Sequence, residues 1–343
     1  MLIRTGIIEG AGFTGGELIQ LLLNHPDVEL EFVTSQANVG KRIDEVHRGL
    51  YDETDLCFVA DSSLGLNGTK GLEQIDMLFL CTECAQSEAW MEAHAPLPEK
   101  LKVVDLSRAF RVKPSETNEE DVLAGARKEF VYGLPELNRR AVCNARYVAN
   151  PGNFATGILL GLLPLARNLM LNGDIVVNSI IGSTGSSERS ATLTSFSWRS
   201  DNISVYKPFR HQHLNEINSA LRQCQSSFQS NIVFIPYYGN FTRGIFTTIV
   251  LKNKVALGQL EHLFEEYYEE DSFTFLSPKP IDLKQVINTN RCLIHLEKEG
   301  DDLLITTCID NLLKGASGQA VHNMNLLFNL EETTGLSLKS AAF

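Results

Sequence analysis

Three glycines near the start of the chain have the spacing of a phosphate-binding turn. Gly10, Gly12 and Gly15 fit the pattern G-x-G-x-x-G, in which glycine allows a tight turn and lets a pyrophosphate approach the N-terminus of the next helix. Together with the intervening Phe13 and Thr14, they are the predicted cofactor-binding residues. The alternative is a tight turn between a strand and a helix that holds no ligand.

A polar segment about twenty residues further on bears on which cofactor would bind. Thr34-Ser35-Gln36 follows an alternating apolar run and contains no acid. An acidic residue at this place normally holds the ribose hydroxyls of NAD. Because Ser35 with nearby Lys41 and Arg42 would better suit a 2′-phosphate, the sequence favours NADP over NAD.

Other candidate groups suit an anionic substrate. Arg108, Arg111 and Arg199 could each grip a phosphate or carboxylate, because a guanidinium presents a planar fork of donors. For the first two, an ion pair with Asp105 is the alternative. The segment Ser183-Thr-Gly185 could bring backbone donors to a ligand or form a plain turn after a strand.

The elements that must position these residues begin with a β-α-β unit. Residues 2–8 have the pattern of a buried strand, residues 17–24 have helical apolar spacing, and residues 28–33 alternate as a second strand. Such a unit implies a parallel sheet. Two further apolar strands and an intervening helix extend the pattern, at 75–81, 101–106 and 85–94.

The character of the sequence changes near residue 150. An apolar helix is predicted over 157–166 and a final helix over 316–330. Strands between them, expected to form a largely antiparallel or mixed sheet, are 174–181, 231–236, 244–251, 291–296 and 302–309. The predicted fold class is α/β: a Rossmann-type parallel-sheet domain (1–149 plus 313–343) and an α+β catalytic and dimerisation domain (150–312).

Length, charge and cysteine content limit the class of protein. The 343 residues, 43% hydrophobic, are more than one core usually holds. A net charge of −12 disfavours nucleic acid or an anionic membrane as a partner, and no signal peptide or membrane span is expected. Seven scattered cysteines predict buried, reduced thiols in the cytoplasm. Cys81 and Cys84 have C-x-x-C spacing, but no second such pair or His pair accompanies them, so no metal site is expected.

Several ordered motifs together resemble one family. They are Gly12–Leu18, Asp105–Arg111, Tyr132–Asn138, Asn150-Pro-Gly152, Gly182–Gly185, His211-Gln-His213 with Glu216, Asp310–Val321 and Asn323-Met-Asn325. On these residues, which span nearly the whole length, the chain resembles N-acetyl-γ-glutamyl-phosphate reductase, a relative of aspartate-semialdehyde dehydrogenase.

The resemblance implies NADPH-dependent reduction of an N-acylglutamyl 5-phosphate to the semialdehyde, with phosphate release, in arginine biosynthesis. In that family a cysteine thiolate at a helix N-terminus displaces phosphate to form a thioester, which hydride reduces. His211 matches the proton-transferring base, a role that suits an imidazole with a pKa near neutrality. His213 and Glu216 match positions near the substrate, with helix capping or a structural hydrogen bond as the alternative. The resemblance places three further residues beside the nicotinamide: Asn311, Gly315 and Gln319.

Two residues depart from the family. Its cysteine follows Asn-Pro-Gly, where this chain has Asn153, and a carboxamide nitrogen is too weak a nucleophile to form a thioester. Asn153 could instead cap a helix expected near Ala155, or hydrogen-bond a substrate phosphate or carboxylate. The family's glycine turn begins with glycine where this chain has Glu9, whose carboxylate would repel a pyrophosphate unless it turns away.

Three hypotheses follow for the activity. The chain is a reductase impaired or altered at its nucleophile, a catalytically silent homologue that retains ligand affinity, or a reductase that acts on a carbonyl or imine without a covalent step, with His211 as proton donor. In each case the expected partner is a small-molecule acyl phosphate or semialdehyde. The family implies a homodimer or homotetramer.

Overall fold

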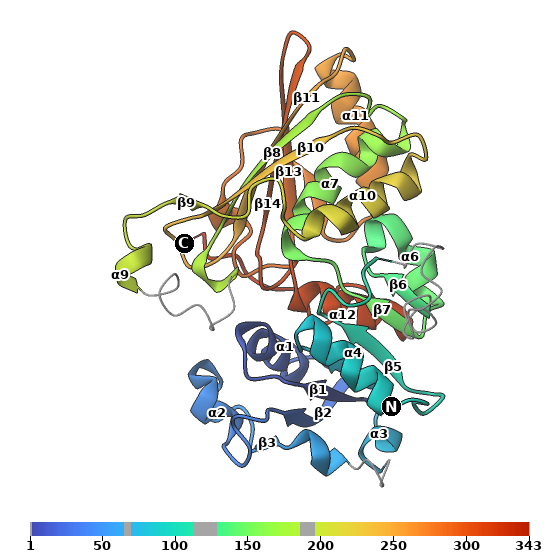
Figure 1. Cartoon of the computed structure of the whole chain (residues 1–343), viewed down its shortest axis with the longest axis vertical. Helices are drawn as coiled ribbons and strands as arrows, with labels where there is room; N and C mark the ends of the chain where they lie inside the picture. Colours follow the sequence, from blue (N-terminus) through green and yellow to red (C-terminus); the bar gives the residue numbers. More distant parts are fainter. Residues whose placement is uncertain (1, 65–69, 113–128, 186–195, 343) are drawn as a thin grey trace. The chain divides into compact units, whose positions relative to one another are not determined.

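The computed structural model describes residues 2–64, 70–112, 129–185 and 196–342. They form two compact units (Figure 1), the first made of Met1–Pro151 with Ala316–Ser337 and the second of Gly152–Gly315 with Leu338–Phe343. Each unit contains its own seven-stranded sheet. The predicted fold class, a Rossmann-type unit followed by an α+β unit, is confirmed.

The first unit is a parallel sheet in the order β3-β2-β1-β4-β5-β7-β6. Its strands are β1 (Ile3–Ile8), β2 (Val28–Thr34), β3 (Phe58–Val59), β4 (Met77–Leu80), β5 (Lys102–Asp105), β6 (Phe130–Tyr132) and β7 (Tyr147–Ala149). Its helices are α1 (Phe13–Leu23), α2 (Ile43–Val46), α3 (Lys70–Gln74), α4 (Cys84–Ala93), α6 (Pro135–Cys143) and α12 (Ser317–Leu327), with short 3₁₀ turns at Arg48–Leu50 (η1) and Asp61–Leu64 (η2).

The strand order of this unit reverses beside β1. The chain runs outward from β1 to β2 and β3, then returns to place β4 on the other side of β1. In open parallel sheets a ligand binds outside the carboxyl ends of the strands at such a reversal. All four residues of β4 are buried, as expected for a strand covered on both faces.

The second unit is a mixed sheet in the order β12-β13-β14-β11-β8-β10-β9. Its strands are β8 (Ile175–Ile181), β9 (Ser204–Val205), β10 (Ile232–Tyr238), β11 (Ile245–Lys252), β12 (Thr274–Leu276), β13 (Cys292–Glu299) and β14 (Asp302–Ile309). Its helices are α7 (Asn153–Arg167), α9 (Phe196–Arg199), α10 (His213–Cys224) and α11 (Leu257–Tyr268), with 3₁₀ turns at Ser183–Gly185 (η3) and Leu283–Gln285 (η4).

Helix α7 lies against one face of the second sheet, with α10 and α11 beside it (Figure 1). Its close approach depends on small residues: a Cβ on Gly161 would lie 2.7 Å from the Cδ1 atom of Ile249 in β11. The Thr307 hydroxyl of β14 donates to the carbonyl oxygen of Gly157 in α7 (3.1 Å). The opposite face of the sheet is less covered, since alternate residues of β8 and β11 are partly exposed.

The predicted elements agree with the structure to within a few residues, apart from helix starts. Helices α1 and α7 each begin four residues before the predicted position, at Phe13 and Asn153, because both start directly after a glycine rather than at the first apolar repeat. Strands β3 and β9 have two residues each, too few to show a periodicity. No helix in the described part of the chain is long and apolar enough to span a membrane.

Candidate active site

The glycine turn of the first unit packs tightly at two glycines and is open at the third. A Cβ on Gly15 would overlap the backbone carbonyl of Gly10, and a Cβ on Gly10 would overlap the Val33 side chain of β2. A Cβ on Gly12 would meet nothing within 4 Å. Gly12 is also the N-cap of α1, with no side-chain cap and no acidic residue in the first turn. The turn therefore fits a pyrophosphate at this helix end.

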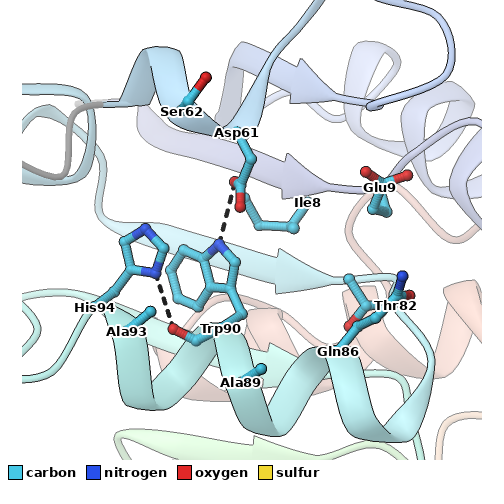
Figure 2. A pocket seen from close by; sticks show the side chains of 10 residues that line it. All are labelled: Ile8, Glu9, Asp61, Ser62, Thr82, Gln86, Ala89, Trp90, Ala93 and His94. Carbon is cyan, nitrogen blue, oxygen red and sulfur yellow. Dashed lines mark hydrogen bonds between the residues drawn. The ribbon is translucent and has the colours of Figure 1, made fainter.

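A pocket of about 430 Å³ extends from the carboxyl ends of β1 and β4, where Glu9 and Thr82 lie, along helix α4 to His94 (Figure 2). Asp61 and Trp90 face each other across it, and the indole Nε1–H donates to the Asp61 carboxylate (3.1 Å). The Trp90 ring also stacks on His94, with 4.1 Å between ring centroids. The full lining is Ile8, Glu9, Asp61, Ser62, Thr82, Gln86, Ala89, Trp90, Ala93 and His94.

The residues that favoured NADP are largely engaged with each other or with acids. The Ser35 hydroxyl, on a buried residue, accepts from the Asn38 amide (3.2 Å), and the Asn38 carbonyl oxygen accepts from the Lys41 amine (3.2 Å). Arg42 forms ion pairs with Asp44 (3.0 Å) and Asp55 (2.8 Å). Because both carboxylates bind its guanidinium, we expect Arg42 not to contact a phosphate beside Ser35.

In the second unit, Asn153 is the first residue of α7. The N-cap is Gly152, so the expectation that Asn153 caps a helix starting near Ala155 is wrong by one position. Its Oδ1 atom accepts from the N–H of Phe154 (2.8 Å). A Cβ on Gly315 would lie 2.9 Å from the Cβ of Asn153, so glycine at 315 provides room for this side chain.

His211 lies in an aromatic enclosure beside the start of α7. The ring contacts Phe154 edge-on, with 5.2 Å between centroids, and packs against Tyr206 and Phe234. Burial, together with the neighbouring His213, lowers the pKa of His211 to about 3, which corrects the expectation of a value near neutrality. Its Nδ1 atom accepts from the N–H of His213 (3.2 Å), which places the proton of the neutral ring on Nε2.

Glu216 connects helix α10 to the segment before Asn153. Its Oε2 atom accepts from the backbone N–H of Gly152 (3.0 Å), and both residues are buried. Its Oε1 atom lies 3.8 Å from the Nε2 atom of His213. The predicted loop entering a helix at 211–216 is confirmed, since α10 begins at His213. Glu216 thus holds the backbone that carries residue 153.

The three predicted arginines have different surroundings. Arg111 donates to the carbonyl oxygens of Asn150 (2.8 Å) and Leu106 (2.9 Å), whereas Arg108 is exposed. Arg199, in the second unit, is 8% exposed and its guanidinium lies 4.1 Å from the centroid of the Tyr238 ring.

Asp105, the alternative partner of Arg108 and Arg111, is buried and contacts two serine hydroxyls. Its carboxylate accepts from the hydroxyls of Ser87 (2.6 Å) and Ser107 (2.7 Å). Burial raises the pKa of Asp105, and the charge of Arg111 acts against that rise.

The residues expected beside the nicotinamide mainly hold turns together. Ser183 donates its N–H to the carbonyl of Phe241 (2.9 Å). The Asn311 side chain donates to the Thr184 hydroxyl (3.1 Å) and accepts from the N–H of Gly244 (2.6 Å). Two others have structural contacts: Gly185, which donates to the Gly182 carbonyl, and the buried Gln319 of the first unit, which donates to the Gly133 carbonyl.

The cysteines differ from the expectation. All seven cysteines are free, but only Cys292 and Cys308 are buried, so the expectation of mostly buried thiols is wrong. Cys57 and Cys143 are exposed because they lie on a loop and a helix end. Among the described residues, no group of three or more His, Cys, Asp or Glu side chains is placed to hold a metal ion.

Sequence reasoning missed Asp61 and Trp90 as lining residues of the first unit's pocket. They lie 29 positions apart and come together only through the strand order. Their one available signal is position, because Asp61 follows strand β3 and Trp90 lies in the helix after β4.

Comparison with known proteins gives consistent matches over both units. Residues 4–145 match the family model "Semialdehyde dehydrogenase, NAD binding domain", and residues 154–311 match "Semialdehyde dehydrogenase, dimerisation domain". The chain is 57% identical to the N-acetyl-gamma-glutamyl-phosphate reductase of Bacteroides thetaiotaomicron and 43% identical to that of Flavobacterium johnsoniae, in each case over the full length of both chains.

Solved structures show the same fold at low sequence identity. Aspartate semialdehyde dehydrogenase II from Vibrio cholerae is similar with a TM-score of 0.71 and 14% identity, covering 96% of this chain and 99% of that one. The aspartate semialdehyde dehydrogenase from Candida albicans, solved with NADP, has a TM-score of 0.66 and 13% identity over 96% and 99% of the two chains.

Proposed function

Because this chain belongs to the N-acetyl-gamma-glutamyl-phosphate reductase family, we propose that it keeps that family's ligand sites and has lost the covalent step. Asn153 carries this proposal. It takes the first position of α7, where the family resemblance places the nucleophile. On either side of it, Gly152 is held by Glu216 and Phe154 contacts His211. The supporting framework is present and the reactive atom is replaced.

The proposed ligands are inferred from the family, from the glycine turn of the first unit and from Arg199 of the second unit. A nicotinamide dinucleotide would bind at the glycine turn of the first unit, with its pyrophosphate against Gly12 and the start of α1. When bound, such a cofactor would supply the hydride donor or acceptor for a substrate carbonyl carbon. An N-acylglutamyl phosphate or its semialdehyde is the proposed substrate. Arg199 is the proposed anion-binding side chain in the second unit, while Arg42 is given no 2′-phosphate contact because Asp44 and Asp55 hold it.

Two of the three thiols in the second unit, Cys224 and Cys308, are poorly suited to replace the missing nucleophile. The sequence of this unit contains Cys224, Cys292 and Cys308. Residue 307 faces α7 through its bond to Gly157, so Cys308, the next residue of the strand, faces the opposite side of the sheet. Burial raises the pKa of Cys308 to about 12 and also raises that of Cys224. These thiols support the proposal that acyl transfer to the protein does not occur.

One observation favours a second candidate function, direct reduction of a carbonyl without a covalent intermediate. The neutral His211 ring carries its proton on Nε2, since Nδ1 accepts from the His213 N–H. A neutral imidazole can donate that proton in a hydrogen bond to a developing oxyanion. Such an activity would need a substrate without a leaving phosphate.

We propose a homodimer formed by the second unit. The matched dimerisation model and the half-covered sheet face support this state. On β11 that face carries Phe246 and Val250, and Val250 is 36% exposed. We expect Val250→Lys to shift the mass measured by light scattering towards the monomer, and Val39→Lys, at an exposed valine of the first unit, to leave it unchanged.

The test of the main proposal is recovery of the thioester route. The purified chain, Asn153→Cys, Asn153→Ser and Asn153→Cys/Glu9→Gly are assayed with N-acetylglutamate semialdehyde and phosphate, with NAD⁺ and NADP⁺ in separate reactions. We expect the parent and Asn153→Ser to be silent. We expect Asn153→Cys to form product at least about a hundred-fold faster, because the thiolate supplies the missing nucleophile.

The alternative outcomes separate the hypotheses. Turnover by the parent that Asn153→Ser preserves would mean that hydride transfer in this chain does not need the covalent route. If Asn153→Cys and the double variant both stay silent while calorimetry detects semialdehyde binding, the result supports the hypothesis of a catalytically silent homologue that retains ligand affinity.

A further inference from the structure

Glu9 is an acid in a position that glycine usually occupies, with a backbone conformation that glycine favours. Its φ angle is +57°, in the left-handed region that costs a side-chain-bearing residue about 1 kcal/mol or more. The N–H of Glu9 donates to the Thr34 hydroxyl (3.0 Å), which fixes the residue against the end of β2. Glu9 is therefore a strained acidic residue at a position where glycine would have no backbone strain.

The side chain of Glu9 crosses from the end of β1 to the loop after β2. Its Oε1 atom accepts from the backbone N–H of Gln36 (3.0 Å), two residues past the end of β2. In this fold an acidic residue at the end of β2 accepts hydrogen bonds from the ribose hydroxyls of NAD. The sequence has no acidic residue at the end of β2, but Glu9, which follows the neighbouring strand β1, places its carboxylate beside the Gln36 N–H just past β2.

The same carboxylate lines the pocket of the first unit, where cationic side chains are scarce. The ten lining residues include Glu9 and Asp61 and no Lys or Arg, and the one histidine is stacked on Trp90. A 2′-phosphate carries nearly two negative charges at neutral pH. The Gln36 N–H could donate to such a phosphate, but it already donates to the Glu9 carboxylate. The 2′-phosphate would therefore lie close to the negative charge of Glu9.

The basic residues near the β2 loop do not offset this charge. Arg42 is paired with Asp44 and Asp55. Lys41 is exposed and donates to the Asn38 side chain, and neither basic residue lines the pocket. A ribose diol, in contrast, can donate to the free lone pairs of a carboxylate that has accepted one backbone N–H.

We propose that Glu9 determines cofactor choice in this chain, accepting the 2′-hydroxyl of NAD(H) and excluding the 2′-phosphate of NADP(H). This inference rests on the proposed dinucleotide site. It reverses the preference for NADP that Ser35, Lys41 and Arg42 favour in the sequence.

The experiment measures binding, so it does not depend on turnover or on residue 153. Isothermal titration calorimetry on the full chain compares NADH with NADPH, and adenosine 5′-monophosphate with adenosine 2′,5′-bisphosphate. The second pair reports on the adenosine end of the site alone. We expect the wild type to bind the ligand without the 2′-phosphate at least about ten-fold more tightly in each pair.

Two variants of Glu9 separate its charge from its shape. Glu9→Gln keeps an acceptor for the Gln36 N–H and removes the charge, so NADPH should gain about ten-fold while NADH changes by less than about three-fold. Glu9→Gly suits the positive φ angle, so the fold is retained, and the two cofactors should bind about equally. Glu29→Gln, at the opposite end of β2, is the matched control and should leave the ratio unchanged.

Other results would overturn the inference in distinguishable ways. Tighter binding of NADPH by the wild type, or a ratio that Glu9→Gln does not move, would remove Glu9 as the determinant and leave the family role intact. Binding of both cofactors only by Glu9→Gly would mean that the carboxylate blocks the whole site. If no variant binds any of the four ligands, the proposed dinucleotide site itself fails.

Discussion

The two units both contain a glycine-containing turn that leads into a helix, and the turns tolerate change differently. The turn at Gly10–Gly15 supports α1 through backbone packing, and its ligand contacts are expected from backbone N–H groups. The turn at Gly152 leads into α7, and the family's chemistry there depends on one side-chain atom, at residue 153. In our proposals, Glu9 therefore alters a preference in the first turn, whereas Asn153 removes a reaction from the second.

The sharpest test of the first half of this comparison uses two glycines of one turn. Gly15→Ala should destabilise the first unit by at least about 3 kcal/mol, because the new Cβ overlaps the Gly10 backbone, which cannot move aside. Gly12→Ala should cost less than about 1 kcal/mol, since its Cβ meets open space. It should still weaken NADH binding, because the methyl group occupies the approach to α1.

Urea unfolding followed by Trp90 fluorescence reports on this unit, in a Trp198→Phe background that removes the second unit's exposed tryptophan. Equal losses of stability in the two alanine variants would show that close backbone packing at Gly15 does not stabilise the turn. That result would contradict the claim that this turn supports α1 through backbone packing.

The second turn is tested through the carboxylate that holds it. Glu216→Ala leaves the buried Gly152 N–H without its acceptor and should cost about 1–3 kcal/mol of stability. Glu216→Gln keeps an acceptor oxygen and should recover most of the loss. The control is Glu265→Ala, at an exposed position of α11. A loss for Glu216→Gln as large as for Glu216→Ala would assign the effect to charge rather than to the bond with Gly152.

The difference between the turns also explains what the sequence could predict. The requirement for glycine at residue 15 is local, because a Cβ there would meet the backbone of Gly10. The glycine spacing predicted the turn and the strand and helix on either side of it. The bond from Gln36 to Glu9 joins residues 27 positions apart, and that from Gly152 to Glu216 joins residues 64 apart. Such pairs depend on strand order and helix packing, which periodicity does not specify.

The environment of a titratable group is equally non-local. His211 has the ordinary chemistry of a histidine in the sequence, but Phe154 and Phe234, from α7 and β10, enclose it in the fold. Burial in that enclosure is the main cause that lowers the pKa of His211 to about 3, and the nearby His213 and Lys207 lower it further.

The remaining expected effect is a pH dependence of stability that arises from His211 in the second unit. Since the pKa of His211 is about 3 in the fold and about 6.5 in an unfolded chain, the unfolded chain binds a proton between these values and the folded unit does not. Stability is therefore full above about pH 6.5 and falls as the pH is lowered, by up to about 1.4 kcal/mol per pH unit. Urea unfolding at pH 7.5, 6.5, 5.5 and 4.5 measures this slope.

The variant His211→Asn isolates that contribution, because asparagine retains an acceptor near the Nδ1 position for the His213 N–H but does not ionise. It should flatten the slope below pH 6.5, whereas His262→Asn, at an exposed histidine of α11, should not. The first unit has the opposite sign at Asp105, whose pKa is raised by burial, so its contribution is full below about pH 3.8 and is lost as pH rises. A slope that persists in His211→Asn would assign the acid sensitivity to other groups and remove the evidence that this ring is neutral in the folded unit.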